Sequence, residues 1–177
     1  MADFIKAYDV VLAHEGGYSN DSLDPGGECY RGVARNIWSK WSGWVKVDLL
    51  RREANFPKNL DGELSLQEDI KDFYRVQFWD KISGDQIANQ EVANSIFDFS
   101  VNCGVGTSAS MAQMVVGVDH DGVIGNDSID AINNFNVDLF LASFTIAKIA
   151  RYVGIVQKRP TSQKYFYGWV RRALGVN

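Results

Sequence analysis

The sequence predicts an all-α fold that carries one irregular, glycine-rich loop near the N-terminus. Apolar residues recur at helical spacing through most of the chain, and the longest such pattern covers residues 136–158. The strand candidates are few and very short. Residues 16–32 are instead rich in Gly, Ser, Asn and Asp and contain Pro25, a composition that interrupts a helix. We therefore expect about seven to nine helices, with an ordered loop or a short irregular hairpin over residues 16–32.

The helices are predicted from apolar faces and from the signals at their ends. In chain order they cover residues 3–14, 66–82, 86–102, 107–117, 126–135, 136–158 and 162–174. Gly16-Gly17 ends the first helix. Ser65 followed by Glu68 matches a capping box that opens the second helix. Pro160 ends the longest helix, because proline cannot continue the hydrogen-bond ladder.

Two further segments have specific expectations. Residues 34–45 carry three tryptophans at helical spacing, a pattern more typical of a core than of a sugar-stacking surface. Residues 121–125 are flanked by glycines and are expected to form a tight turn between two short helices. In that turn we expect Val123 and Ile124 to pack inward.

The composition fits one globular domain, or one domain with a small appendage. The chain has 177 residues and a net charge of −4, and a core of this size buries about two-thirds of the unfolded surface without a metal or a disulfide. The acidic balance argues against a nucleic-acid partner. Two Cys and two His residues without paired spacing are too few for a zinc centre, so no metal and no cofactor are expected. The absence of a stretch of about 18 uncharged apolar residues argues against membrane insertion.

Glu15 and Asp24 are candidate catalytic carboxylates. Glu15 stands where a helix ends, and the negative end of the helix dipole disfavours its charged form. A partly buried aromatic cleft would disfavour that form further, and a general acid needs the protonated form. The glycine loop can bring Asp24 back to face Glu15, and two facing carboxylates are the minimum equipment for cleaving a glycosidic bond. A plain helix end followed by a plain turn at Asp24-Pro-Gly-Gly is the structural alternative.

Longer motifs resemble a known family. Its N-terminal signature is similar to Glu15-Gly-Gly-Tyr18, Asn20-Asp21, Asp24-Pro-Gly-Gly27 and Gly32 of this chain. Later family segments are similar to Phe78-Trp79-Asp80, Asp98, Asn102 and Gly106-Thr-Ser108. These motifs resemble the glycoside hydrolase family 108 lysozymes, which are N-acetylmuramidases of phage and bacterial origin. Asp121-Gly-Val-Ile-Gly125 resembles a turn of the predicted peptidoglycan-binding domain that is joined to them.

The resemblance implies both an architecture and a set of roles. A lysozyme-like catalytic region over residues 1–105 and a helical peptidoglycan-binding region over residues 106–177 are expected to pack into one compact unit. Glu15 would act as the general acid in hydrolysis of the β-1,4 bond between N-acetylmuramic acid and N-acetylglucosamine. By analogy with phage-type lysozymes, Asp24 and Cys29 would hold the attacking water. Substrate contacts are implied for Tyr18, Asn20, Trp79 and Asn102.

Cys29 departs from the family pattern, which usually has threonine at this place. A thiol is a weaker hydrogen-bond partner than a hydroxyl, so the substitution weakens the water-holding half of the mechanism. Two alternatives therefore stay open. One is a peptidoglycan-binding protein of the same fold with little or no turnover. The other is an amidase or peptidase that uses Cys29 as nucleophile, with His14 or His120 as its base.

The expected partner is the glycan strand of peptidoglycan, and the protein is expected to act as a monomer. The N-terminal residues lack the charged, apolar and small-residue regions of a signal peptide. An endolysin that is released through a holin-type membrane hole, or an enzyme with a dedicated secretion route, would fit this pattern.

Overall fold

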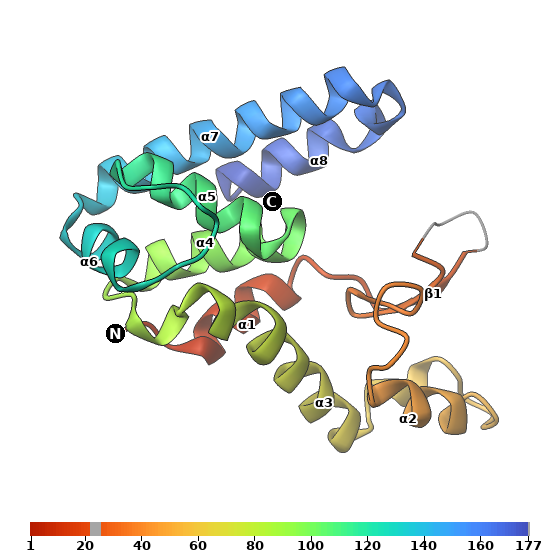
Figure 1. Ribbon diagram of the computed structural model, residues 1–177. Coiled ribbons are helices and arrows are strands. Elements are labelled where there is room, and N and C mark those ends of the chain that lie inside the picture. Colours follow the sequence, from red (N-terminus) through yellow and green to blue (C-terminus); the bar gives the residue numbers. More distant parts are fainter. Residues whose placement is uncertain (22–25, 177) are drawn as a thin grey trace. The chain divides into compact units, whose positions relative to one another are not determined.

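The structure, a computed structural model, describes residues 1–21 and 26–176 (Figure 1). Eight α-helices and one small sheet make up the regular structure of these residues, which confirms the all-α prediction. The α-helices are α1 (Phe4–Leu12), α2 (Gly43–Leu50), α3 (Leu64–Tyr74), α4 (Gln90–Cys103), α5 (Val105–Val116), α6 (Asn126–Asn134), α7 (Val137–Lys158) and α8 (Gln163–Leu174). Shorter helical turns are η1 (Lys58–Leu60), η2 (Arg75–Trp79), η3 (Asp80–Ile82), η4 (Gly84–Gln86) and η5 (Pro160–Ser162).

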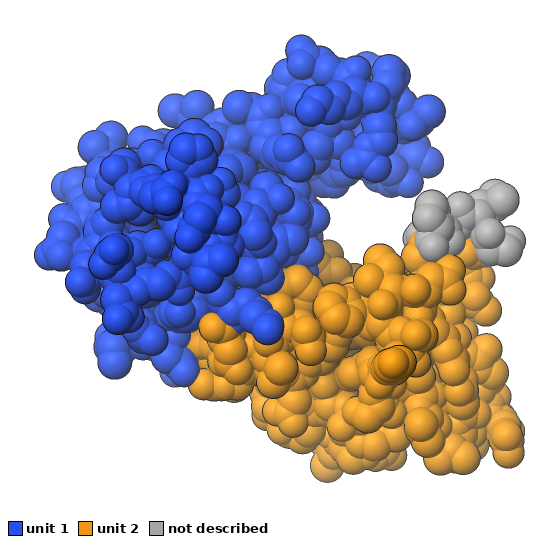
Figure 2. Space-filling view, in the orientation of Figure 1, with its two compact units in different colours: residues 1–3, 81–177 blue, residues 4–80 orange. Residues whose placement is uncertain are grey.

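The chain forms two compact units (Figure 2). The unit of residues 4–80 contains α1, α2, α3 and the sheet, and it is called the N-terminal unit below. Residues 81–177 together with residues 1–3 form the other, the C-terminal unit. This division reflects packing, and the functional division expected at residues 105–106 stays a prediction.

The expected irregular hairpin is a three-stranded antiparallel sheet. Its strands are β1 (Tyr18–Asn20), β2 (Glu28–Tyr30) and β3 (Val33–Ala34), in the order β1-β2-β3. Tyr18 lies opposite Tyr30 in the first pair, and Tyr30 lies opposite Val33 in the second. Strands this short cannot be stable alone. They are held by the packing of Tyr30 and Val33, which are both buried.

Aromatic side chains form the core of the N-terminal unit. The ring of Phe4 on α1 lies 5.7 Å from Trp79, and the ring of Tyr8 lies 5.7 Å from Tyr74 on α3. These contacts follow from the apolar face predicted for the first helix. Burial raises the pKa of Tyr8 to about 12, since the phenolate form is disfavoured away from water.

The start of α3 differs from the capping box predicted at Ser65. Glu63 is the N-cap residue, and its carboxylate accepts hydrogen bonds from the backbone N–H and the hydroxyl of Ser65. A carboxylate at this place also interacts favourably with the positive end of the helix dipole. The helix therefore begins at Leu64, and its α-helical part ends at Tyr74 before a π-helical turn, rather than continuing to residue 82.

Residues 34–45 do not form the helix that their tryptophan spacing suggests. The backbone N–H of Trp41 bonds to the carbonyl of Trp38, and that of Trp44 bonds to the carbonyl of Trp41, so consecutive three-residue turns set the spacing. The indole N–H of Trp44 also donates to the Trp38 carbonyl at 3.0 Å. The Trp38 carbonyl therefore accepts hydrogen bonds from these two donors and not from the backbone N–H four residues later, as it would in an α-helix. Helix α2 begins only at Gly43.

The C-terminal unit is a bundle in which α4 packs on α5 and α7 packs on α8 (Figure 1). The helical segments predicted over 136–158 and 162–174 are confirmed within one or two residues. The buried ring of Phe99 contacts two other buried rings, Phe144 at a centroid distance of 5.7 Å and Tyr152 at 5.9 Å. Helix α7 is long and apolar enough to cross a membrane by length and composition alone, and the expectation of no membrane insertion stays a prediction. Its inner face packs on α4, α5 and α8.

The turn at residues 121–125 is built around Gln113 of α5. The Gln113 amide accepts from the backbone N–H of Gly122 at 2.9 Å and donates to the carbonyl of Val123 at 3.0 Å. Ile124 is buried as expected, but Val123 is 68% exposed and the prediction for it was wrong. The Asp121 carboxylate accepts from the Val123 N–H, and neighbouring residues in an extended turn point to opposite sides, so only one of the two side chains reaches the core.

Candidate active site

A tight turn between β2 and β3 forms the centre of the candidate site. Its two residues, Arg31 and Gly32, both have positive φ, 45° and 79°. This is the pattern of a type I′ hairpin turn, whose twist matches that of the flanking strands. Glycine adopts such a φ without cost, whereas arginine needs support from its surroundings.

Arg31 has that support from three directions. Its guanidinium donates to Asp61 at 2.9 Å, and its backbone N–H donates to the carbonyl of Gly17 at 3.1 Å. Its own carbonyl accepts a hydrogen bond of 2.9 Å from the hydroxyl of Tyr74 on α3. The turn is therefore fixed to α3 on one side and to the loop that follows Glu15 on the other.

Glu15 lies just beyond α1, where its backbone N–H bonds to the carbonyl of Leu12 at 3.2 Å. Its carboxylate lies against Gly32, since a Cβ placed on that glycine would be 2.7 Å from Oε2 of Glu15. The same Cβ would overlap the hydroxyl oxygen of Tyr74. The half-buried Glu15 carboxylate and the Tyr74 hydroxyl thus border one glycine, and any side chain there would displace them.

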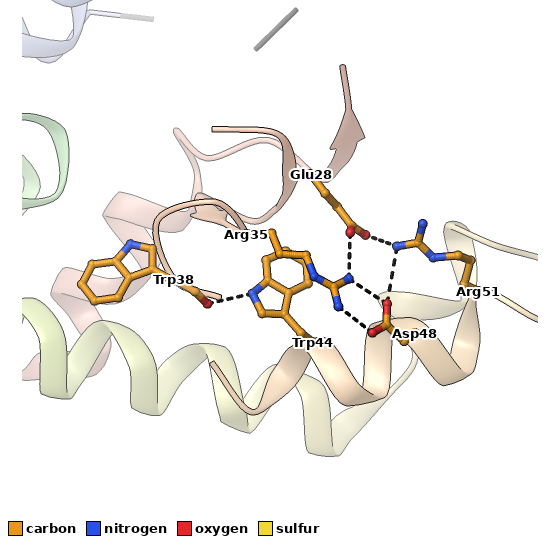
Figure 3. A network of polar contacts seen from close by, with 6 residues as sticks. All are labelled: Glu28, Arg35, Trp38, Trp44, Asp48 and Arg51. Atoms are coloured by element: carbon orange, nitrogen blue, oxygen red, sulfur yellow. Dashed lines mark hydrogen bonds and ion pairs between the residues drawn. The ribbon is translucent and has the colours of Figure 1, made fainter. Parts of the chain in front are cut away.

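A second carboxylate of this region, Glu28 on β2, has a structural role (Figure 3). Its side chain is 10% exposed and forms ion pairs with Arg35, at 2.9 Å, and with Arg51. Arg35 also forms two hydrogen bonds with Asp48, and these hold the pKa of the Asp48 carboxyl below its usual value. Glu28 therefore ties the sheet to α2. Its oxygens are occupied by the guanidinium groups of structural ion pairs.

Cys29 occupies the middle of β2, opposite Ser19 of β1 and Ala34 of β3. Because side chains alternate along a strand, its thiol points to the face of the sheet opposite to that of Glu28 and Tyr30. Cys29 is half-buried. Cys103 is also half-buried, and burial raises its pKa to about 11, which disfavours a reactive thiolate.

The predicted residues around the glycine loop lie on or beside β1. Tyr18 opens the strand, and its ring meets that of Phe56 edge-on at 4.7 Å. Burial, and after it the carboxylate of Glu28, raises the pKa of Tyr18. Asn20 ends the strand and is exposed. Asp24 lies outside the described residues, in the connection between β1 and β2.

The two substrate contacts predicted outside the glycine-rich loop, Trp79 and Asn102, both make contacts within the protein. Trp79 is fully buried beneath Phe4, so it has no exposed ring face for a sugar, and its prediction as a substrate contact was wrong. The family segment at residues 78–80 therefore contributes to the core. Asn102 belongs to the C-terminal unit, where its side-chain oxygen accepts hydrogen bonds from Tyr152 and Cys103 at 3.2 Å.

A cavity of about 660 Å³ opens in the N-terminal unit between α3 and the turns before α2. Two half-buried indole rings, those of Trp38 and Trp41, line it together with Phe73, which both of them meet edge-on. Ile37 and Val76 also line the cavity, as do six polar residues: Ser39, Lys40, Ser42, Asp69, Asp72 and Gln77. Helical spacing had suggested that these tryptophans are core residues, but the three-residue turns leave two of their rings at a surface hollow.

Sequence reasoning did not single out Tyr74 as part of the site. Tyr74 falls within the helix predicted over residues 66–82, and its side chain is buried. Its function in the site comes from the hydroxyl group. The sequence could have indicated this role, because a buried tyrosine, unlike a phenylalanine, usually has a hydrogen-bond partner for its hydroxyl. Among residues 1–21 and 26–176, no group of three or more His, Cys, Asp or Glu is placed to hold a metal ion.

Comparisons with known proteins agree with the sequence motifs. Residues 8–104 match the glycosyl hydrolase 108 family, and residues 107–174 match a predicted peptidoglycan domain. The fold is similar to the structure of Brucella abortus SagA, with a TM-score of 0.67 and 30% sequence identity, over 97% of this chain and 94% of that one. No curated protein matches the chain. The chain belongs to the glycosyl hydrolase 108 family and is a glycoside hydrolase that acts on peptidoglycan.

Proposed function

We propose that the protein is an N-acetylmuramidase and that Glu15 is its general acid. The observation that carries this proposal is the position of the Glu15 carboxylate, at a helix end and against the backbone of Gly32. A general acid has to meet the bridging oxygen of a bulky polysaccharide, and a glycine beside the acid lets sugar and backbone approach closely. The bond cleaved would be the β-1,4 bond between N-acetylmuramic acid and N-acetylglucosamine.

In this mechanism Glu15 donates its proton to the leaving oxygen as the glycosidic bond breaks. The transition state resembles an oxocarbenium ion and is stabilised by nearby negative charge. Asp24, nine residues further along the chain, would supply that charge and, with Cys29, would hold the attacking water. The separation of the two carboxyl groups sets the outcome, with about 6.5–9.5 Å for inversion and about 5–5.5 Å for retention.

The cavity beside Trp38 and Trp41 would bind sugars of the same glycan strand. Aromatic faces suit the apolar C–H face of a sugar ring, and carboxylates and amides suit its hydroxyl groups. In the part of the chain that the structure describes, the indole N–H of Trp38 and the side chains of Asp72 and Gln77 make no hydrogen bond or ion pair. They are therefore available to a ligand. The Trp41 indole instead donates to the carbonyl of Asp69 at 3.3 Å, which fixes its ring.

The test is a digest of purified cell walls, analysed for the chemical groups that appear. A muramidase releases new reducing ends that terminate in N-acetylmuramic acid. New free amines without reducing ends, together with loss of activity after thiol blocking, would support a Cys29-dependent amidase or peptidase. A protein that sediments with walls and releases neither group would be a binding protein.

A further inference from the structure

The cationic residues of this protein are distributed unevenly along the chain. Residues 139–177 contain seven Lys and Arg residues and no Asp or Glu. Residues 1–138 contain the other 11 Lys and Arg residues and all 22 Asp and Glu residues. In this acidic chain the charged side chains of residues 139–177 are thus all cationic, and they fall on α7, α8 and the turn between these helices (Figure 1).

Two of the seven cations serve the interior of the C-terminal unit. Arg172 pairs with the buried Asp98 at 2.8 Å. Lys148 is buried, donates to the hydroxyl of Ser95 at 2.9 Å and lies over the ring of Phe144. Burial lowers the pKa of Lys148, which fits a cation held in the core rather than offered to solvent.

The other five cations make no ion pair with any described residue. They are Arg151, Lys158, Arg159, Lys164 and Arg171. Lys164 and Arg171 lie over the tyrosine rings of their own helix, those of Tyr165 and Tyr167. Arg151, Lys158 and Arg159 have no such ring partner among the residues described, and they lie at the surface of the hairpin.

These three cations converge on two adjoining hollows. One has a volume of about 320 Å³ and is lined by Arg151, Lys158 and Arg159 around Gly154 and Ile155. The other, of about 250 Å³, shares Arg151, Ile155 and Arg159 and adds Tyr152, Trp169 and Asn102. A Cβ at Gly154 would meet no atom within 4 Å, so the backbone along this part of α7 is uncrowded. Each hollow therefore combines guanidinium groups with an apolar wall.

We propose that these hollows bind carboxylates of the short peptides attached to the peptidoglycan glycan strand. Guanidinium groups form paired hydrogen bonds with carboxylates. Arg151 and Lys158 are two turns apart on α7, roughly 10 Å along the helix axis, which suits two carboxylates of one short peptide. Ile155 and Trp169 supply contacts for its methyl groups. The match of residues 107–174 to a peptidoglycan domain covers all of these side chains.

The proposal rests on peptidoglycan as the substrate and is independent of the bond that is cleaved. It assigns the glycan to the N-terminal unit and the peptide to the α7–α8 hairpin. Cations that gather without carboxylate partners repel one another, so an anionic ligand that binds between them relieves this repulsion. Binding is expected to weaken as salt rises, because exposed charges are screened beyond about 8 Å at physiological ionic strength.

The experiment measures binding to the full-length Glu15→Gln protein, which does not digest the ligand if Glu15 is the acid. The ligands are a soluble disaccharide-peptide from peptidoglycan, the same compound with its carboxylates amidated, and the disaccharide without peptide. We expect the untreated compound to bind, and amidation to weaken binding at least about tenfold. Arg151→Gln with Arg159→Gln should cause a similar loss.

Lys164→Gln with Arg171→Gln is the matched control, because it removes the same charge from the same hairpin outside both hollows. Binding of this control should stay within about twofold of the parent, and circular dichroism should show that both double variants are folded. Equal losses in the two double variants, or equal binding of the amidated compound, would overturn the proposal. Stronger binding to teichoic acid, nucleic acid or anionic lipid vesicles than to the peptide compound would overturn it as well.

The outcome is separable from that of the proposed glycosidase function. If Glu15→Gln retains full activity on walls, the assignment of the general acid fails. Peptide binding is then measured at low temperature, by sedimentation of cell walls with the parent protein and with the Arg151→Gln, Arg159→Gln double variant. This measurement still tests the binding of peptide carboxylates at the hollows.

Discussion

The hydroxyl group of Tyr74 donates a hydrogen bond of 2.9 Å to the backbone carbonyl of Arg31, 43 residues earlier in the chain. This bond connects α3 to the turn that carries Gly32. Since the Glu15 carboxylate lies against Gly32, the bond fixes the surface on which the proposed general acid rests. Tyr74 is thus a positioning residue that acts through the turn.

Tyr74→Phe should destabilise the protein and lower its activity. The variant removes the donor of the part-buried hydrogen bond to the Arg31 carbonyl, and loss of such a bond should lower the unfolding free energy by about 1 kcal/mol. Urea unfolding measures this loss, and turbidity clearing of cell walls measures the activity. Tyr30→Phe is the comparison variant, because the Tyr30 hydroxyl accepts from Gln67 at 3.0 Å and donates to Asp61 at 3.4 Å, so its loss touches the Arg31 side chain through Asp61 but not the Arg31 carbonyl. If both variants lose activity in proportion to stability, Tyr74 has no separate positioning role.

Gly32→Ala should reduce activity more strongly than Tyr74→Phe. An alanine at φ 79° is strained, and its Cβ would displace the Glu15 carboxylate or the Tyr74 hydroxyl. Strain of this kind costs about 1–3 kcal/mol. Gly62→Ala, at a glycine with an ordinary φ and no atom within 3.8 Å of the added Cβ, should change stability little. A Gly32→Ala protein with parental activity would show that the contact between Glu15 and Gly32 is unimportant.

Glu15→Gln tests the general acid directly. Glutamine keeps the size of the side chain but has no proton to transfer, so the rate should fall by about 10²–10⁴-fold. The melting temperature should change little, since Glu15 lies beyond the end of α1 and outside its apolar face. Release of reducing ends from walls is the measurement. Parental rates in this variant would exclude Glu15 as the acid.

Cys29→Thr separates two roles of the thiol. If Cys29 holds the attacking water, a hydroxyl of similar size should give equal or higher activity, because it is the better hydrogen-bond partner. If Cys29 is a nucleophile, the same change should abolish activity, while Glu15→Gln should then matter less. Assays with and without thiol blocking check this result. A dead Cys29→Thr enzyme beside an active Glu15→Gln enzyme would support the cysteine hydrolase.

Trp38→Ala should raise KM more than it lowers kcat, if the aromatic cavity binds sugar away from the reacting bond. We expect KM on long glycan strands to rise about tenfold, which corresponds to about 1.4 kcal/mol of lost binding free energy. Trp38→Phe keeps a flat apolar ring and should recover most of the affinity. Quenching of tryptophan fluorescence by N-acetylglucosamine oligomers reports binding independently. Equal KM values for the parent and both variants would exclude a sugar contact at Trp38.

Local patterns in the sequence were enough to predict most of the helices, though not α2, and the candidate acid. The apolar faces of α1, α7 and α8 repeat at 3.6 residues, and their ends carry Gly or Pro, so the predicted ranges are close to the observed ones. Glu15 was singled out because it follows a helix and precedes two glycines. Each of these signals depends on neighbours within a few residues, which is why it can be read from the sequence.

The tertiary structure decided which side chains surround that acid and which do not. The contact between Glu15, Gly32 and Tyr74 joins residues up to 59 positions apart, and no local pattern encodes it. Trp79 is buried beneath Phe4, although its motif suggested a substrate contact. The sign of charge along residues 139–177 is visible in the sequence. Only the fold, however, places Asp98 against Arg172 and leaves Arg151 and Arg159 at a hollow, because ion pairing depends on distances that helix packing sets.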